Sequence, residues 1–250
     1  MNDTDRDWEE LSRQDPYWAV LSNAEYRGLG ESREGLGRFF ETGRRHVTEI
    51  CQRFERHFGR DPEGAATAVD FGCGVGRLLL PMAARARFAI GVDVSQTMRA
   101  TCRERAAAEG VRNVDICADL ETLHRRGVKA DWINSYIVFQ HIPTMRGYQL
   151  LDSLLELTAP ACLCSIHVTL YKDARLMHYA TSGTRFFQSS DTGTRSVLRE
   201  ERARNTPEMQ MNDYDLTRVH ALFLRHGFGE LVMVHEDQAG IHGVMIYAAK

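Results

Sequence analysis

The sequence predicts an α/β protein whose sheet is doubly wound and mostly parallel. Strand-like apolar runs alternate with helical segments from about residue 65 to residue 170, and the first run breaks into a glycine turn. Right-handed crossovers between strands that alternate with helices build a parallel sheet covered on both faces. A chain of 250 residues is long enough to bury one such core.

The glycine turn lies in residues 69–78, V-D-F-G-C-G-V-G-R-L, at the end of the first predicted strand. Gly72, Gly74 and Gly76 allow positive φ angles and let a ligand approach the backbone without meeting a Cβ. The nicotinamide fingerprint G-x-G-x-x-G requires glycine at position 77, where this chain has Arg77. The turn therefore argues against a dinucleotide enzyme, and taken alone it also fits a plain strand-to-helix joint.

The second predicted strand, residues 88–95, contains an acid near its end. Asp93 follows Gly72 by 21 residues, the spacing expected for a carboxylate that binds a ribose hydroxyl. Its alternative role is to cap the next helix, which we predict over residues 96–109. Ser95 lies directly before that helix and is better placed as its N-cap, so we favour the ribose role for Asp93.

The alternation continues through the rest of the parallel sheet. We predict strands over residues 114–118, 132–139 and 161–170 and helices over residues 75–86, 120–126 and 144–158. Pro81 lies within the first of these helices, so it either kinks that helix or marks a late start. A helix over residues 214–226 then precedes two strands, 230–236 and 240–249, whose short connection predicts an antiparallel hairpin.

Four motifs carry a family resemblance. D-F-G-C-G-V-G-R, G-V-D-V-S, C-A-D-L and V-F-Q-H-I-P, in this order and spacing, closely resemble successive motifs of class I S-adenosylmethionine-dependent methyltransferases. The resemblance covers about residues 65–171. It implies a Rossmann-like, seven-stranded sheet with an antiparallel C-terminal hairpin strand, in a catalytic domain over residues 61–250. It also implies S-adenosylmethionine as the cofactor and S-adenosylhomocysteine as the product.

The same resemblance assigns the cofactor contacts. The segment from Asp70 to Gly76 would wrap the methionine end, Asp93 would hold the ribose hydroxyls, and Asp119 with Leu120 would clasp the adenine. Carboxylates suit these roles because the cofactor offers hydroxyl and amine donors. The expected cofactor-binding residues are Asp70, Gly72, Cys73, Gly74, Gly76, Arg77, Asp93, Val94, Met98, Asp119, Leu120, Phe139 and Gln140. Met98 has a plain core position as its alternative.

Three residues are candidates for the catalytic group. His141 follows the fourth strand at the carboxyl edge of the sheet, where ligands of open α/β folds bind, and imidazole titrates near neutral pH. Its alternative role is to tie the turn at residues 140–143 to the next helix. His167 lies within the fifth strand, where a histidine is more often a buried core residue than an acceptor contact, whereas Tyr171 at the strand end suits the wall of an acceptor pocket.

Two segments fall outside this core. Residues 1–60 form an N-terminal extension, for which we expect a lid over residues 15–43 and a helix packed on the sheet over residues 44–58. Residues 172–213 are polar and too long for an ordinary connection, so we expect an inserted cap, a dimer contact or a disordered loop. Phe186 and Phe187 favour an ordered cap.

The charge and composition of the chain argue against nucleic acid and membranes as its partners. The formal net charge of −3 gives no basic footprint for nucleic acid or an anionic membrane, and no run of apolar residues is long enough to span a bilayer. The N-terminus lacks the features of a signal peptide, so we expect a cytoplasmic protein. The six cysteines lack a paired C-x-x-C, so we expect neither a metal site nor disulfides, and core packing accounts for Cys162 and Cys164.

These observations predict an enzyme that transfers a methyl group to oxygen or nitrogen of a small acceptor, such as a sugar or a specialised metabolite. The turn at residues 139–143 lacks the Asn/Asp-Pro-Pro-aromatic pattern of related enzymes that methylate amino groups of nucleic-acid bases. The alternatives are a non-catalytic binding or assembly protein of the same fold and a nicotinamide oxidoreductase. A homodimer is compatible with the sequence.

Overall fold

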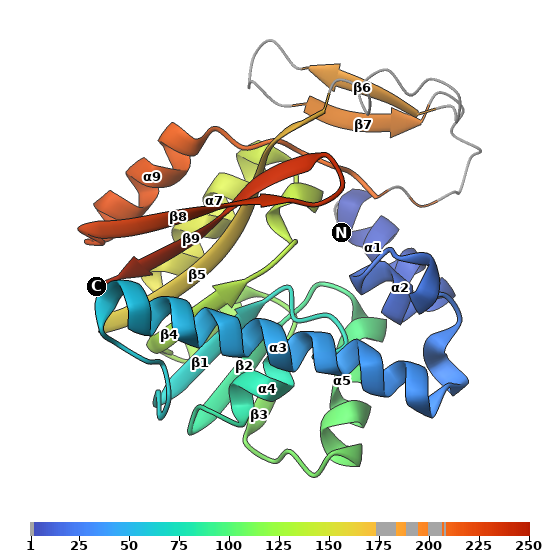
Figure 1. Ribbon diagram of the computed structural model, residues 1–250, viewed down its shortest axis with the longest axis horizontal. Helices are drawn as coiled ribbons and strands as arrows, with labels where there is room; N and C mark the ends of the chain where they lie inside the picture. The colour runs from blue at the N-terminus through green and yellow to red at the C-terminus, as the bar shows by residue number, and fades with distance from the viewer. Residues whose placement is uncertain (1–2, 174–183, 189–194, 200–206, 208) are drawn as a thin grey trace.

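Seven strands form a single mixed sheet, as predicted (Figure 1). The computed structural model describes residues 3–173, 184–188, 195–199, 207 and 209–250. The strand order is β3-β2-β1-β4-β5-β9-β8, in which β1 to β5 run parallel and β9 runs antiparallel to both β5 and β8. The strands are β1 Thr67–Phe71, β2 Phe88–Val92, β3 Val114–Cys117, β4 Ala130–Ser135, β5 Thr158–Lys172, β8 Glu230–Asp237 and β9 Ile241–Ala249.

The strand order reverses at β1. From β1 the chain first proceeds to β2 and β3 on one side and then crosses back to β4 and β5 on the other. Ligands of open α/β sheets bind outside the carboxyl ends of the strands at such a reversal. The topology therefore places the loops after β1, β2, β3 and β4 around one crevice.

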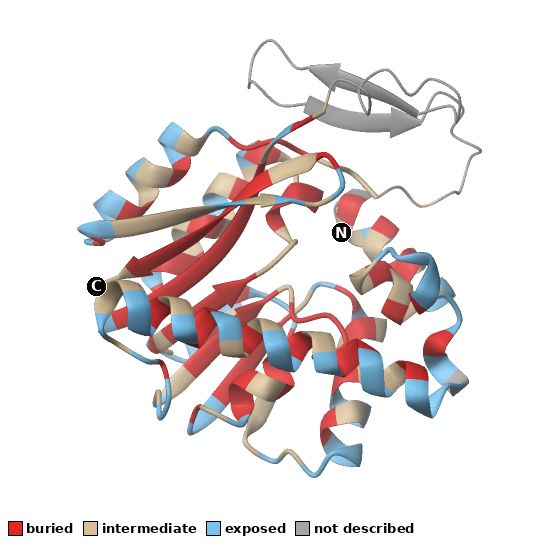
Figure 2. Cartoon of the chain, in the orientation of Figure 1, coloured by how far each residue is buried: buried red, intermediate tan, exposed pale blue. Residues whose placement is uncertain are grey.

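Helices cover both faces of the sheet, and the buried residues concentrate on its strands (Figure 2). One apolar layer joins the sheet to α6 Leu120–Arg125, α7 Thr144–Glu156 and α9 Leu216–Arg225. The other joins it to α3 Arg33–Phe58, α4 Leu79–Ala83 and α5 Gln96–Ala108. No described helix combines the length and the hydropathy that crossing a bilayer requires.

Two boundaries near the crevice differ from the sequence prediction. The helix α4 begins at Leu79 rather than at residue 75, because residues 72–78 are used by the glycine turn. Pro81 therefore lies in the first helical turn, where its missing N–H removes no hydrogen bond. The strand β4 ends at Ser135 rather than at residue 139, because the chain turns at Ile137, whose φ is 58°.

The N-terminal extension is helical. It comprises α1 Asp3–Gln14, α2 Pro16–Val20, the 3-10 turns η1 Ala24–Tyr26 and η2 Leu29–Glu31, and the start of α3. The Ser32 hydroxyl accepts the Gly35 N–H at 3.0 Å and caps the start of α3, and Gly59, with a φ of 59°, caps its end. Residue 44, where we expected the packed helix to begin, lies inside the 26 residues of α3.

Part of the 172–213 segment is ordered as a hairpin. The strand β6 Thr184–Gln188, which contains Phe186 and Phe187, pairs antiparallel with β7 Arg195–Arg199. Residues 174–183, 189–194, 200–206 and 208, on which the cap prediction also rested, lie outside the described residues. From residue 209 the chain runs along the end of the sheet, where the Tyr214 N–H donates to the Thr169 carbonyl at 2.7 Å.

Gly43 allows α3 to approach the glycine turn closely. A Cβ at Gly43 would overlap the carbonyl oxygen of Arg77, whereas a Cβ at Gly37 on the same helix would meet nothing within 4 Å. We expect Gly43→Ala to lower the free energy of unfolding by about 1–3 kcal/mol, because the helix must shift. Gly37→Ala is the matched control and should raise that free energy by about 0.5–1 kcal/mol. Urea unfolding of both variants is the measurement, and equal effects would contradict the close approach.

Candidate functional site

A cavity of about 500 Å³ lies at the crevice predicted by the topology. Its walls come from the loops after β1, β2, β3 and β4, from α1 and α2, and from the first turns of α5, α6 and α7. Eight of the residues predicted from the sequence line it, namely Gly72, Gly74, Asp93, Val94, Met98, Asp119, Leu120 and His141. Lining residues that were not predicted include Trp8, Tyr136, Ile137, Val138 and Arg146.

The glycine turn has the conformation that its sequence suggests. Gly72, Gly74 and Gly76 have φ angles of 77°, 53° and 88°. A Cβ at Gly72 would overlap the Val138 side chain, and a Cβ at Gly74 would lie 2.8 Å from Cγ2 of Val20. Gly76 instead faces the core, where a Cβ would lie 2.8 Å from Sγ of Cys102. Gly72 and Gly74 therefore keep the cavity open, and Gly76 allows α5 to pack.

Asp93 joins the turn to the end of β2. Its Oδ2 accepts the Gly74 N–H and its Oδ1 accepts the Ser95 N–H, each at 2.9 Å. Burial raises the pKa of this carboxyl. Each carboxylate oxygen has a second lone pair that can accept a ligand hydroxyl. The predicted N-cap at Ser95 is confirmed, since its hydroxyl accepts the Met98 N–H at 3.1 Å.

Asp119 combines a capping position with a place in the cavity wall. Its Oδ1 accepts the N–H of Thr122 at 2.8 Å and the hydroxyl of Thr122 at 2.7 Å, and these bonds lower its pKa. The apolar walls beside it differ in exposure. Met98 is 2% exposed, whereas Val94 is 38% exposed and has open space for a flat ligand.

Three other predicted cofactor residues lie behind the turn rather than in the cavity wall. Asp70 accepts a hydrogen bond from the Asn134 amide at 2.8 Å, and burial raises its pKa to about 7. Arg77 is buried and donates to the Thr42 hydroxyl at 3.3 Å. Cys73 is buried in the layer beneath α4. We infer that these residues support the turn.

Phe139 and Gln140 also lie outside the cavity wall, within the 3-10 turn η3 Phe139–His141. The Phe139 ring packs on Phe71 with centroids 5.5 Å apart. The Gln140 Oε1 accepts the Thr169 hydroxyl at 2.7 Å. Both side chains therefore fasten the loop after β4 to the core.

His141 lines the cavity with both ring nitrogens engaged. Nδ1 lies 2.7 Å from the Gln210 carbonyl oxygen, and Nε2 lies 3.1 Å from the Gln140 amide nitrogen. The carbonyl can only accept and the amide N–H donates, so the neutral ring carries its proton on Nδ1. Burial lowers the pKa of His141 to about 4. These contacts favour the turn-tying role over the role of a base.

The other two catalytic candidates lie apart from the cavity wall. His167 is 2% exposed on β5, and its Nε2 lies 3.8 Å from Oε2 of Glu236. Tyr171 is 47% exposed and stacks on His242, with ring centroids 4.5 Å apart. The tyrosine that lines the cavity is instead Tyr136. Its place directly after β4 was the one sequence signal that pointed to it.

Two polar anchors hold α1 across the cavity. The Glu9 carboxylate accepts the Ser95 hydroxyl at 2.8 Å, and it accepts the N–H and hydroxyl of Thr97 at 3.2 and 2.9 Å. Arg146 on α7 donates to the two carboxylate oxygens of Asp5 at 2.5 and 3.2 Å. Between the anchors, the Trp8 ring contacts the His141 ring with centroids 4.8 Å apart. The N-terminal helix thus forms one wall of the cavity.

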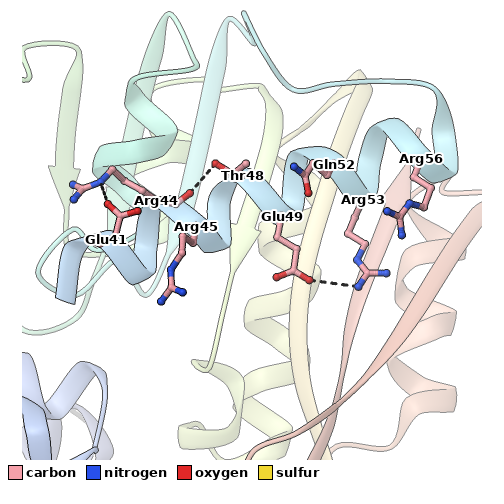
Figure 3. Close-up of a pocket in the computed structure, with 8 residues that line it drawn as sticks. All are labelled: Glu41, Arg44, Arg45, Thr48, Glu49, Gln52, Arg53 and Arg56. Carbon is pink, nitrogen blue, oxygen red and sulfur yellow. Dashed lines mark hydrogen bonds and ion pairs between the residues drawn. The ribbon is translucent and has the colours of Figure 1, made fainter. Parts of the chain in front are cut away.

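A second hollow, of about 410 Å³, lies on the outer face of α3 (Figure 3). Its side chains pair with one another, as in Arg44 with Glu41 at 2.8 Å and Arg53 with Glu49 at 3.4 Å. These side chains extend from one solvent-facing helix surface (Figure 3). The hollow has the character of a solvated helix face, so the candidate site is the crevice at the sheet edge.

The family model described as "Methyltransferase domain" matches residues 68–161, which include the glycine turn, Asp93 and Asp119. Residues 68–161 are thus similar to methyltransferase domains, which is consistent with the class I S-adenosylmethionine-dependent methyltransferase family. The family resemblance expected from the sequence motifs is thereby confirmed, and the family's cofactor is S-adenosylmethionine.

Two curated relatives of the methyltransferase domain are ubiquinone biosynthesis O-methyltransferases. The protein from Sinorhizobium medicae (strain WSM419) is 33% identical over 37% of this chain and 40% of its own length. The protein from Chelativorans sp. (strain BNC1) is 29% identical over 52% of each chain. The matched region therefore spans about half the length of these relatives or less.

A solved structure supports the fold over nearly the whole chain. The magnesium protoporphyrin IX methyltransferase from Synechocystis PCC 6803 with bound SAH aligns over 96% of this chain and 99% of its own, with a TM-score of 0.59. The sequence identity is 16%, so this similarity concerns the fold alone.

The cavity of the methyltransferase domain fits its cofactor. Gly72 and Gly74 leave the backbone exposed at positions where a side chain would fill the space. This exposed backbone suits the methionine end of S-adenosylmethionine. Asp93 and Asp119 line the cavity with carboxylate oxygens that could accept bonds from ribose hydroxyls and an adenine amine. Val94, Met98 and Leu120 line it with apolar side chains that would suit a purine.

We expect Glu9→Gln to lower the free energy of unfolding by about 1–3 kcal/mol at pH 7, because hydrogen bonds to a charged acceptor are lost. Burial raises the pKa of Glu9, but the bonds from Ser95 and Thr97 outweigh it, so the pKa is lowered from 4.5. The stabilisation should be fully present above pH 4.5 and lost as the pH falls through the lower folded pKa.

The measurement is urea unfolding of both proteins across this pH range. Glu10→Gln on the same helix is the control and should change the free energy by less than about 0.5 kcal/mol. An effect of Glu9→Gln that persisted unchanged into acid would contradict the assigned role of the carboxylate.

Proposed function

We propose that the protein is a methyltransferase that uses S-adenosylmethionine to methylate a small molecule. The proposal depends most on one observation, which is that the open glycine turn, Asp93 and Asp119 meet around a single cavity at the strand-order reversal. A protein without cofactor has no physical need to bring these groups together. This argues against the non-catalytic alternative.

When bound, the cofactor supplies an electrophilic methyl group, and the acceptor forms a bond to its carbon as the carbon–sulfur bond breaks and its electron pair goes to sulfur. The protein's contribution is chiefly position. The Asp93 and Asp119 carboxylates fix the nucleoside, and the glycine turn fixes the chain that carries the methyl group. Alignment of this kind lowers the activation free energy by at most about 7–11 kcal/mol.

Oxygen is the acceptor atom that the relatives favour. Both curated proteins are named O-methyltransferases of ubiquinone biosynthesis. The cavity also suits a small molecule, since Trp8, Ala19 and Val20 from the N-terminal helices cover it and leave limited space. We propose that α1 and α2 act as the lid that excludes water during transfer. Sugars and specialised metabolites belong to this class of small acceptors that are methylated on oxygen.

A nicotinamide oxidoreductase is the weaker candidate. The third glycine of its fingerprint is replaced by Arg77, whose side chain is 6% exposed and packs toward α3.

We expect the protein to bind S-adenosylhomocysteine and not NAD in a calorimetric titration. Asp93→Asn should raise the dissociation constant for S-adenosylhomocysteine by roughly 10- to 100-fold. This is the effect of losing hydrogen bonds to a charged acceptor that contribute about 1.5–3 kcal/mol. Asp115→Asn is the matched control, because Asp115 on β3 pairs with Arg126 outside the cavity and should leave the dissociation constant unchanged.

Binding of NAD without S-adenosylhomocysteine would move the protein to the oxidoreductase class. Equal dissociation constants for the wild-type protein and Asp93→Asn would contradict the ribose assignment but not the methyltransferase class.

A further inference from the structure

An ion pair joins two walls of the cavity. Arg146 on α7 donates from Nη1 and Nη2 to the two carboxylate oxygens of Asp5 on α1, at 2.5 and 3.2 Å. Both residues line the cavity, and Arg146 is the single Lys or Arg among the described residues that do so. The positive charge of the cavity wall therefore lies where α1 meets α7.

The guanidinium of Arg146 has donors left for a ligand. It carries more N–H groups than one carboxylate can engage, and its hydrogen bonds to described residues all go to Asp5. The side chain of Arg146 is 31% exposed, and that of Asp5 is 12% exposed. A ligand in the cavity can thus reach the guanidinium, which is the first condition for a binding role.

The helix that carries Arg146 adds to the attraction for an anion. Arg146 lies in the first turn of α7, and that turn contains no acidic residue. Pro143 occupies the N-cap, and no described side chain caps the helix. The N–H groups at the start of a helix carry partial positive charge, so this end of α7 favours negative groups. The Asp5 carboxylate is the negative group that the structure shows there.

The neighbours of the ion pair on both helices are apolar. Trp8 follows Asp5 by three residues on α1, and Leu150 follows Arg146 by four residues on α7. These spacings put each neighbour on the same helix face as its charged residue. All four residues line the cavity, as does Ile142 just before α7. One cation among apolar walls suits a carboxylate that is attached to an apolar body.

The ion pair also discriminates between charged and neutral ligands. A neutral ligand that comes between α1 and α7 separates Asp5 from Arg146 and leaves the guanidinium without a compensating charge, which is costly in a partly buried site. A carboxylate instead replaces Asp5 on the same N–H groups. The pair therefore favours an anionic ligand over a neutral one of the same shape.

The carboxylate of the cofactor is the other candidate for this cation, and the layers of the fold argue against it. We assign the methionine end of the cofactor to the glycine turn, which leads into α4 on one face of the sheet. The helix α7 packs with α6 on the opposite face. Arg146 thus lies on the other side of the sheet from α4, where an acceptor is the better match.

We propose that Arg146 binds a carboxylate of the acceptor as a recognition group and that Asp5 occupies this position while the acceptor is absent. This inference rests on the proposed methyltransferase function and narrows its acceptors to acids with an apolar body. The carboxylate of the acceptor takes the N–H groups of Arg146, and Asp5 moves away with the first turn of α1. The contacts of Glu9 and Trp8 keep the rest of α1 over the cavity.

Calorimetric titration of benzoate into the full chain saturated with S-adenosylhomocysteine tests the recognition site. Benzamide has the same shape without the charge and should bind roughly tenfold more weakly. Arg146→Gln should raise the dissociation constant for benzoate by roughly 10- to 100-fold, because charge-assisted hydrogen bonds are lost. Arg126→Gln is the matched control, since Arg126 pairs with Asp115 outside the cavity, and it should leave that constant unchanged.

The variant Asp5→Asn should have the opposite effect. Removal of the competing carboxylate should lower the dissociation constant for benzoate by roughly 2- to 5-fold, the size expected for a partly exposed ion pair. Asp115→Asn is the control and should not change it. If the pair only anchors α1, Asp5→Asn should instead weaken benzoate or leave its binding unchanged, and either result would overturn the inference.

The remaining outcomes separate this inference from the proposed function. Arg146→Gln should keep the wild-type dissociation constant for S-adenosylhomocysteine. A large loss of S-adenosylhomocysteine affinity in this variant, with benzoate binding unaltered, would assign Arg146 to the cofactor and overturn the inference. Equal binding of benzoate and benzamide, or no binding of either, would also overturn it, and these outcomes leave the proposed function intact. Failure of the wild-type protein to bind S-adenosylhomocysteine would instead overturn the proposed function.

Discussion

The site depends on the bridge that Asp93 makes between the backbone of Gly74 and that of Ser95. One carboxylate joins the turn after β1 to the start of α5, so the loops of two neighbouring strands keep a fixed distance. The Gly74 N–H reaches this carboxylate from a turn with positive φ angles, which glycine adopts at little cost. Charge-assisted bonds of this kind contribute about 1.5–3 kcal/mol each, enough to hold an open loop beside a cavity.

The loop after β4 imposes a second constraint on the opposite wall. Ile137 has a φ of 58°, a conformation that costs a β-branched residue about 1–3 kcal/mol. The strain places the Val138 side chain in the space that a Cβ at Gly72 would occupy. Tyr136 in the same loop also lines the cavity, and its ring contacts the His167 ring with centroids 5.4 Å apart. The strained loop thus shapes the cavity wall at the end of β4.

The sequence predicted what depends on local pattern and missed what depends on distant contacts. Strand alternation, the glycine spacing and the Ser95 cap are short-range features, and the structure confirms the fold and the cap. The bond between Tyr136 and Glu236 joins residues 100 positions apart, and the bonds from Glu9 to Thr97 span 88. No periodicity encodes such pairs. Motif position also did not reveal that Asp70 and Phe139 support the loops from behind, because burial decides which residues of a motif face the ligand.

The two halves of the crevice differ in charge, and this difference decides which chemical groups each half can bind. The half at β1, β2 and β3 has carboxylates, which accept the hydroxyl and amine donors of a cofactor whose sulfonium is positive. The half at the loop after β4 has the neutral ring of His141 and the aromatic and apolar side chains of Tyr136, Ile137 and Val138. Carboxylates suit the donor groups of the cofactor, and apolar and aromatic side chains suit the uncharged part of an acceptor, so the two halves differ in the kind of group that each can bind.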